Sequence, residues 1–295
     1  MKDAFSNRHP LVNFAFFTAV ILFSMFQMHP VCLVISMLCA LTNAVMLGGK
    51  TTALFSLKFL LPTALLISII NPLTNHQGAT ILEYLPWGNP LTLESIAYGA
   101  ASAALLCSVV LWFSCVNKVM TSDKLVYLFG RISPALSLVL AMLLRFIPRF
   151  TSQFRQVKRA QKQFSQSKGK SLLGKLKNGF KVLSVMVSWS MENAIDTADS
   201  MKSRGYGLKG RTSFAIYRFT CYDAVALSAI AAQAAALLLL TVFGKIPFRY
   251  FPSVEGNLWD GYCILFYIIY ALMMLMPIIM NVKEGIGWKR LRSKI

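Results

Sequence analysis

Three acidic side chains in the second half of the chain have the spacing of a metal site. Glu192, Asp196 and Asp199 follow one another at intervals of four and three residues, so a helix would place all three on one face. Clustered carboxylates of this kind hold Mg²⁺ and diphosphate in integral-membrane prenyl or phospholipid transferases. Lys202 follows at the same spacing, however, and acid–base pairs on a solvated helix face explain the cluster more simply. A Mg²⁺-dependent transferase therefore stays an alternative, and we expect no catalytic residue, metal site or cofactor.

The other residues that could do chemistry are scattered. His9, His29 and His76 lie far apart in sequence, which argues against a shared metal ion. The six cysteines lie in or beside apolar runs without a Cys-x-x-Cys spacing, so we expect small buried hydrophobic residues. Gly169-Lys170-Ser171 resembles the end of a phosphate-binding loop, but position 164, where the first glycine of that pattern belongs, is Phe. No nucleotide site is predicted.

The composition is that of a membrane protein. The chain has 295 residues, of which 56% are hydrophobic and 14% charged, and a mean hydropathy of +0.58. This is more apolar surface than a soluble core of that size can bury. Windows long enough to cross a hydrocarbon layer of about 30 Å occur at 11–28, 30–47, 54–70, 92–116, 223–243 and 262–281. We predict an all-α, multispanning fold with about six transmembrane helices, the first retained rather than cleaved as a signal peptide.

The distribution of basic residues predicts the orientation. Nineteen of the 30 Lys and Arg residues lie in the insertion at 117–220, against four acidic residues, whereas 71–90 contains no Lys or Arg. Because cytoplasmic loops are enriched in Lys and Arg, we expect this insertion and both termini to be cytoplasmic and 71–90 to be external. The same bias explains the net charge of +19 without nucleic acid. Three regions follow: membrane spans at 1–116, a basic cytoplasmic region at 117–220, and spans with a basic tail at 221–295.

Within the insertion the apolar pattern becomes one-sided. Ser133-Pro134 is expected to open an apolar helix over 135–146 that lies against or within the membrane, and Pro148 is expected to bend or end it. An amphipathic helix follows, and its apolar face is expected to hold Phe150, Phe154, Val157, Gln161 and Phe164. Residues 165–177 are rich in Gly, Ser and Lys and are predicted to form a mobile loop.

A second amphipathic helix is predicted after that loop, capped by Asn178. Its apolar stripe is expected to hold Phe180, Leu183, Val187, Met191, Ala194, Ala198 and Met201. The helix is expected to end at Arg204, because Gly205 and Gly207 are typical helix stops. Outside the insertion, the turn-rich segment 71–90 predicts a small hairpin or re-entrant cap around 79–85, and Thr92 is expected to begin the next helix.

The end of the second amphipathic helix resembles a known family. The decapeptide at 198–207, Ala-Asp-Ser-Met-Lys-Ser-Arg-Gly-Tyr-Gly, with Arg211-Thr212 after it, is similar to the signature of the T component of energy-coupling factor (ECF) transporters, the EcfT/CbiQ family. The similarity extends to Leu-Arg-Phe-Ile-Pro at 144–148, to Arg-Ala-Gln at 159–161, and to the order of the spans, so it covers nearly the whole chain.

This resemblance implies a coupling subunit in a bacterial plasma membrane. In that family two Ala-Arg-Gly-type motifs end two crossed helices and dock into two ABC-type ATPases. The second motif corresponds to Ser203, Arg204 and Gly205, while the first falls near 163–165, where the arginine is absent. Either Arg159 or Lys162 supplies the charge instead, or the two ATPases are engaged unequally. The apolar stripes would form a platform for the substrate-binding S component in vitamin or transition-metal uptake: Phe150, Phe154, Val157, Phe180, Leu183, Val187, Met191 and Met201. A self-sufficient permease is the other alternative, but the apolar centres of the spans hold almost no ionisable residue.

Overall fold

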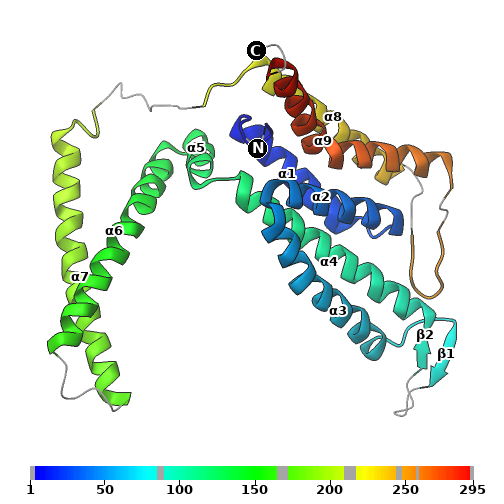
Figure 1. Cartoon of the computed structure of the whole chain (residues 1–295), viewed down its shortest axis with the longest axis horizontal. Helices are drawn as coiled ribbons and strands as arrows, with labels where there is room; N and C mark the ends of the chain where they lie inside the picture. Colours follow the sequence, from blue (N-terminus) through cyan, green and yellow to red (C-terminus); the bar gives the residue numbers. More distant parts are fainter. Residues whose placement is uncertain are drawn as a thin grey trace. The chain divides into compact units, whose positions relative to one another are not determined.

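The computed structural model of the chain is almost entirely helical (Figure 1). It describes residues 4–84, 90–164, 172–208, 217–243, 248–256 and 259–292. The residues divide into two compact units, one formed by Met1–Thr121 with Tyr217–Ile295 and the other by Ser122–Ile216. The helices of the first unit are α1 (Pro10–Phe26), α2 (Pro30–Phe55), α3 (Leu61–Thr74), α4 (Leu93–Val119), α8 (Cys221–Phe243) and α9 (Gly261–Arg292). Those of the second unit are α5 (Ser122–Ile132), α6 (Pro134–Phe164) and α7 (Leu172–Ser203).

Helix length and hydropathy confirm the predicted all-α, multispanning class. Among the described residues, five helical segments are long and apolar enough to cross a membrane: Pro30–Gly49, Leu93–Val119, Ala135–Gln163, Cys221–Phe243 and Gly261–Gly287. The predicted spans at 11–28 and 54–70 correspond to shorter apolar helices, Pro10–Phe26 and Lys58–Thr74. The segment in α6 was expected only as an apolar helix against or within the membrane, and with 29 residues it is at least as long as the other four candidate spans.

The first unit is held together around α4, which packs against α1, α2 and α3. Trp112 of α4 is fully buried, and Phe16 and Phe17 of α1 meet its ring edge to face at centroid distances of 6.2 and 6.5 Å. Its indole nitrogen donates a hydrogen bond to Ser36 Oγ of α2 at 3.2 Å, and Ser36 in turn bonds Ser24 of α1 at 2.9 Å. Such polar links between helices satisfy groups that hydrocarbon cannot.

Helix α2 is broken near its end, which fixes where the predicted second span stops. Gly49 has φ +60° and ψ −149°, a conformation that residues with a side chain rarely adopt. A short π-helical turn, η1 (Ser56–Leu60), then leads into α3.

The predicted hairpin is confirmed. Strands β1 (Ile81–Tyr84) and β2 (Pro90–Thr92) pair antiparallel, with Glu83 opposite Leu91. Thr92 caps α4 as expected, since its hydroxyl accepts a hydrogen bond from the Ser95 backbone N–H at 3.3 Å. The Glu94 carboxylate accepts hydrogen bonds from the backbone and hydroxyl of Thr80, which ties the hairpin to the start of α4.

Three local predictions in the second unit are wrong in part. Helix α6 opens at Pro134 after Ser133 as expected, but it continues through Pro148 to Phe164, so this proline does not end it. Helix α7 begins at Leu172, which places 172–177 in its first turns rather than in a loop and puts Asn178 inside the helix rather than at its cap. The rest of the predicted loop, 165–171, lies outside the described residues. Leu176 supports the longer helix, because it lies four residues before Phe180 and continues the apolar side of α7 toward its start.

Candidate functional site

Helices α6 and α7 pack as an antiparallel pair along an aromatic seam. Phe146 of α6 stacks on Trp189 of α7 with centroids 5.8 Å apart, and Phe150 lies 6.3 Å from the same ring. The Arg149 guanidinium lies 5.9 Å from the Trp189 centroid, a cation–π distance. Further along, Met186 of α7 is only 3% exposed. These contacts hold the two helices together by packing on one side of each.

An apolar face of α7 is left uncovered beside that seam. Phe180 is 70% exposed and Met191 is 65% exposed. The exposed apolar face, as we call this surface, consists of Leu176, Phe180, Leu183, Val187, Met191 and Ile195 of α7. Of the other predicted platform residues, Phe154 is exposed while Phe150, Val157 and Met201 are half-buried. A row of large apolar side chains in water is unfavourable, so such a face marks a contact surface.

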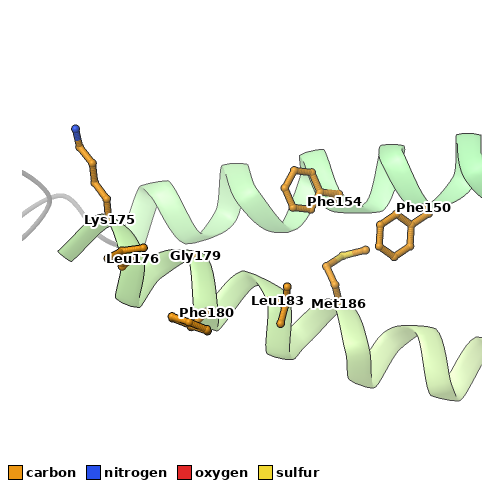
Figure 2. Close-up of a pocket in the computed structure, with 8 residues that line it drawn as sticks. All are labelled: Phe150, Phe154, Lys175, Leu176, Gly179, Phe180, Leu183 and Met186. Carbon is orange, nitrogen blue, oxygen red and sulfur yellow. The ribbon is translucent and has the colours of Figure 1, made fainter. Parts of the chain in front are cut away.

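A groove lies between the two helices at one end of the pair (Figure 2). Its volume is about 670 Å³, and its lining is formed by Phe150, Phe154, Lys175, Leu176, Gly179, Phe180, Leu183 and Met186. In Figure 2 the Phe150 ring lies between the two helices beside Met186, and the Lys175 ammonium extends outward at one end of the groove. Gly179 leaves room here, since nothing lies within 4 Å of where its Cβ would be.

The far end of α7 is a hydrogen-bonded stop that presents Arg204. The Tyr206 N–H donates to the Met201 carbonyl at 3.0 Å, and the Gly205 N–H donates to the Lys202 carbonyl at 2.9 Å. This pair of bonds is the Schellman motif, and it requires the φ of +78° that Gly205 adopts. Arg204 is the exposed C-cap residue just before that turn. Its guanidinium therefore stands at the tip of the helix.

The two predicted coupling regions lie at opposite ends of the antiparallel pair. Phe146 meets Trp189, whereas Phe154 lines the groove with Phe180, so position rises along α6 as it falls along α7. The C-terminal end of α6, with the exposed Arg159 and Lys162, is thus separated from Arg204 by the length of α7. A helix of 32 residues is about 48 Å long. The structure does not bring these basic residues together.

The acidic cluster and the histidines do not form a metal site. Glu192, Asp196 and Asp199 are exposed along α7. Across the described ranges, no group of three or more His, Cys, Asp or Glu side chains could hold a metal ion. His9 caps α1, where its Nδ1 accepts from the Leu11 N–H at 3.3 Å, and His29 shares a hydrogen bond with the Tyr267 hydroxyl at 3.0 Å. Burial lowers the pKa of His29, which favours its neutral ring.

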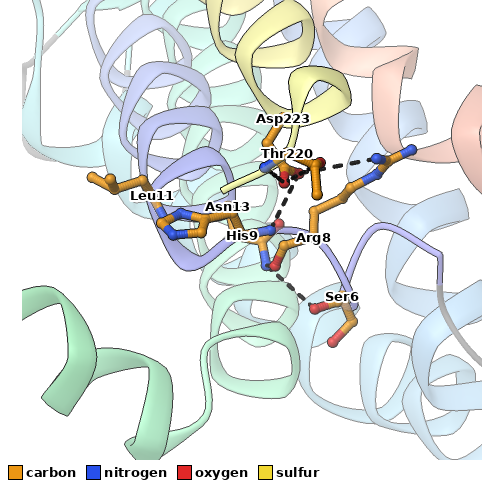
Figure 3. Close-up of polar contacts among 7 residues, drawn as sticks. All are labelled: Ser6, Arg8, His9, Leu11, Asn13, Thr220 and Asp223. Atoms are coloured by element: carbon orange, nitrogen blue, oxygen red, sulfur yellow. Dashed lines mark hydrogen bonds and ion pairs between the residues drawn. The ribbon is translucent and has the colours of Figure 1, made fainter. Parts of the chain in front are cut away.

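Sequence reasoning missed a buried polar cluster where α1 and α8 begin (Figure 3). Asp223 of α8 is 4% exposed, and its carboxylate accepts hydrogen bonds from the Thr220 hydroxyl at 2.6 Å, the Thr220 N–H at 3.0 Å and the His9 N–H at 3.4 Å. Arg8 forms an ion pair with it at 3.9 Å. The N-terminal cluster, as we call it, joins residues more than 200 positions apart. The Thr220–Asp223 part of the cluster was detectable in the sequence, because Thr-x-x-Asp before an apolar run is a capping-box pattern.

The sequence also missed which apolar residues form the seam. Val182, Met186 and Trp189 recur at helical spacing and lie beside the predicted stripe, not within it. Val182 and Met186 are buried, and Trp189 packs against Phe146 and Phe150 of α6. Leu176 extends the exposed apolar face by one turn before the predicted stripe, and Ile195 joins it within the range that the stripe already covered. The signal for Leu176 was its spacing of four from Phe180, but it lay in the segment predicted to be a loop.

Comparison with known proteins agrees with this architecture. The family model described as "Cobalt transport protein", CbiQ, matches residues 3–214, which include α1–α7 and the end of α7 at Arg204. A search of curated proteins found no match. Several apolar helices and this match together indicate a multi-pass membrane component of a transport system. The chain therefore belongs to the CbiQ family of cobalt transport proteins.

Proposed function

We propose that the chain is the T component of an ECF transporter, which transmits ATP-driven motion from two cytoplasmic ATPases to a substrate-binding S component during micronutrient uptake. Membership of the CbiQ family supports a role in such transport. The motif resemblance at 198–207 supports the coupling role. In this proposal the S component, and not the chain itself, binds the substrate, which is a vitamin or a transition-metal ion.

The single observation that carries the proposal is the presentation of Arg204. The Schellman turn fixes the backbone on either side of this residue, so the guanidinium projects from a defined point and not from a loose segment. Arginine carries a permanent charge on a planar fork that pairs with a carboxylate through two hydrogen bonds. An exposed arginine on a rigid helix tip is well suited to enter an acidic groove of an ATPase.

The antiparallel pair offers two docking points for two ATPases. One is the tip of α7, formed by Ser203, Arg204 and Gly205, and the other is the end of α6, near Arg159 and Lys162. They lie at opposite ends of the pair, and α7 by itself is about 48 Å long, which leaves room for two separate subunits. Because the arginine of the first motif is absent near 163–165, we expect the two ATPases to be held with unequal strength.

The exposed apolar face suits the S component. A membrane subunit that packs against Val187, Met191 and Ile195 would cover side chains that are otherwise at least half exposed. Apolar contacts are not directional, so they allow a partner to slide or reorient while it stays bound. In this arrangement the 117–220 region is cytoplasmic, as are both termini, and the protein lies in the bacterial plasma membrane.

Substitution of Arg204 tests the coupling role. Arg204→Glu should leave the chain inserted and folded but should abolish co-purification of at least one ATPase and abolish uptake, because losing one partner of a buried ion pair typically costs about 2–5 kcal/mol. Arg204→Lys should give an intermediate loss, since lysine keeps the charge without the fork. Lys170→Glu is the matched control with the same charge change.

Normal assembly and uptake by Arg204→Glu, with Lys170→Glu defective, would show that the coupling role is wrong. Metal-dependent turnover by the purified chain alone would instead support the transferase alternative, and transport by it alone would support a permease.

A further inference from the structure

One end of the antiparallel pair carries only positive charge. Between residues 124 and 191 the sequence has 13 Lys and Arg residues and no Asp or Glu. The acidic residues of α7, Glu192, Asp196 and Asp199, all lie in its C-terminal half. Because the helices are antiparallel, the last turns of α6 and the first turns of α7 form a common basic end.

The apolar groove lies at this basic end. Its lining is formed by aromatic and aliphatic side chains, with Lys175 at its border. A second ammonium belongs to Lys158, which lies 5.9 Å from the centroid of the Phe154 ring that lines the groove. Lys177 and Lys181 are exposed on the same turns of α7. The groove is therefore an apolar channel bordered by cations.

We propose that this groove binds an anionic phospholipid, with an acyl chain against Phe154, Phe180 and Leu183 and the headgroup phosphate beside Lys158 and Lys175. An apolar surface with basic residues at its border is the pattern by which helices bind the headgroup–acyl boundary of anionic membranes. The candidate membrane span in α6, Ala135–Gln163, includes the groove residues Phe150 and Phe154. A lipid site here goes beyond the coupling role and does not depend on it.

Charge favours a lipid over a protein segment at this end. A protein partner would need carboxylates placed opposite the lysines around the groove. An anionic lipid already carries a negative charge on its headgroup phosphate. The two halves of α7 then have different partners: lipid at the basic N-terminal half, and the S component at the C-terminal half, where Met191 and Ile195 lie beside acidic residues.

A fluorescence experiment on the full chain tests this site. A fluorophore is attached at Gly179→Cys, which lines the groove with open space around its Cβ, in a Cys221→Ser background, because Cys221 is exposed and the other five cysteines are buried. The labelled chain is placed in phosphatidylcholine nanodiscs that contain nitroxide-labelled phosphatidylglycerol or, at the same fraction, nitroxide-labelled phosphatidylcholine. We expect labelled phosphatidylglycerol to quench more strongly than labelled phosphatidylcholine. The ratio of the two affinities should be roughly fivefold for each lysine that contacts the headgroup, and added salt should reduce this ratio.

The variants separate the site from general charge. Lys158→Gln with Lys175→Gln should remove the preference, whereas Lys202→Gln with Lys283→Gln, which removes the same charge elsewhere, should keep it. Equal quenching by both lipids would overturn the proposal. Absence of quenching by either lipid would also overturn it, because no lipid would then occupy the groove. A preference that survives the Lys158 and Lys175 changes would show that these lysines do not form the site.

Discussion

At the scale of single residues, the position of Arg204 depends on its neighbour. Gly205 adopts φ +78°, and the two Schellman hydrogen bonds form only with this left-handed conformation. A Cβ at Gly205 would also lie 3.1 Å from the Leu208 side chain. Ser203 adds a local bond, because its hydroxyl donates to the Ser200 carbonyl at 2.9 Å. The motif Ser203-Arg204-Gly205 is thus a structural stop and, in our proposal, a docking tip.

Two glycines of α7 should respond to alanine in opposite directions. Gly205→Ala should lower the free energy of unfolding by about 1–2 kcal/mol, because alanine is strained at positive φ. Gly179→Ala lies in the helix interior with open space around its Cβ, so it should raise stability by about 0.5–1 kcal/mol. Thermal unfolding of the purified chain in detergent measures both. Stabilisation by Gly205→Ala would mean that α7 does not end in a left-handed turn.

At the scale of elements, the N-terminal cluster joins the starts of α1 and α8. Asp223 serves as the capping residue of α8 and as the acceptor for the backbone before α1 (Figure 3). Asn13 of α1 adds to it, since its side-chain amide donates to the Ser6 carbonyl at 3.4 Å. A buried carboxylate with several donors is costly to remove, because each donor is left without its acceptor.

Loss of the Asp223 carboxylate should loosen both elements. Asp223→Ala is expected to lower the free energy of unfolding by about 2–3 kcal/mol and to speed amide hydrogen exchange over residues 4–13. Arg8→Ala should have a smaller effect, because its ion pair is long and one-third exposed. Glu284→Ala, an acid exposed on α9, serves as the control and should change neither quantity. Equal effects from Asp223→Ala and Glu284→Ala would contradict a structural role for the cluster.

At the scale of the whole molecule, charge is segregated along the sequence. The second unit contains most of the Lys and Arg residues, while the hairpin of β1 and β2 with its flanking turns contains no Lys or Arg. Membrane proteins keep such basic segments on the cytoplasmic side. Cytoplasmic ATPases can dock only if the second unit lies on the cytoplasmic side, so the proposed function requires the predicted topology.

Accessibility of two cysteines checks the topology. In a background without the six native cysteines, Gln77→Cys and Gly169→Cys should react with a membrane-impermeant thiol reagent from opposite sides, position 77 from outside intact cells and position 169 only after permeabilisation. The exposed Gln77 side chain makes the first site reactive. Reaction of both from the same side would refute the predicted orientation.

The sequence alone determined the class of this protein and several of its local features. Hydropathy and length indicate membrane helices, while Thr92, Ser133 and Gly205 mark helix starts and stops by hydrogen bonds that reach only a few residues. The hairpin of β1 and β2 was predictable for the same reason, because the turn signals lie in the segment that forms it. These features depend on residues that are close to one another in the chain, so nearby positions in the sequence are enough to predict them.

Only the tertiary structure decided which face of α7 is buried. Apolar residues surround much of this helix, so spacings of three and four fit two adjacent stripes equally well, and the aromatic rings of α6 selected Met186 and Trp189 over Leu183 and Val187. Helix α7 extends back over Leu176, whose side chain lines the groove, although the local composition rich in Gly, Ser and Lys did not indicate a helix there. The contact of His9 with Asp223 spans 214 positions, and no local rule relates residues so far apart. Packing and long-range hydrogen bonds depend on partners that only the folded chain brings into reach.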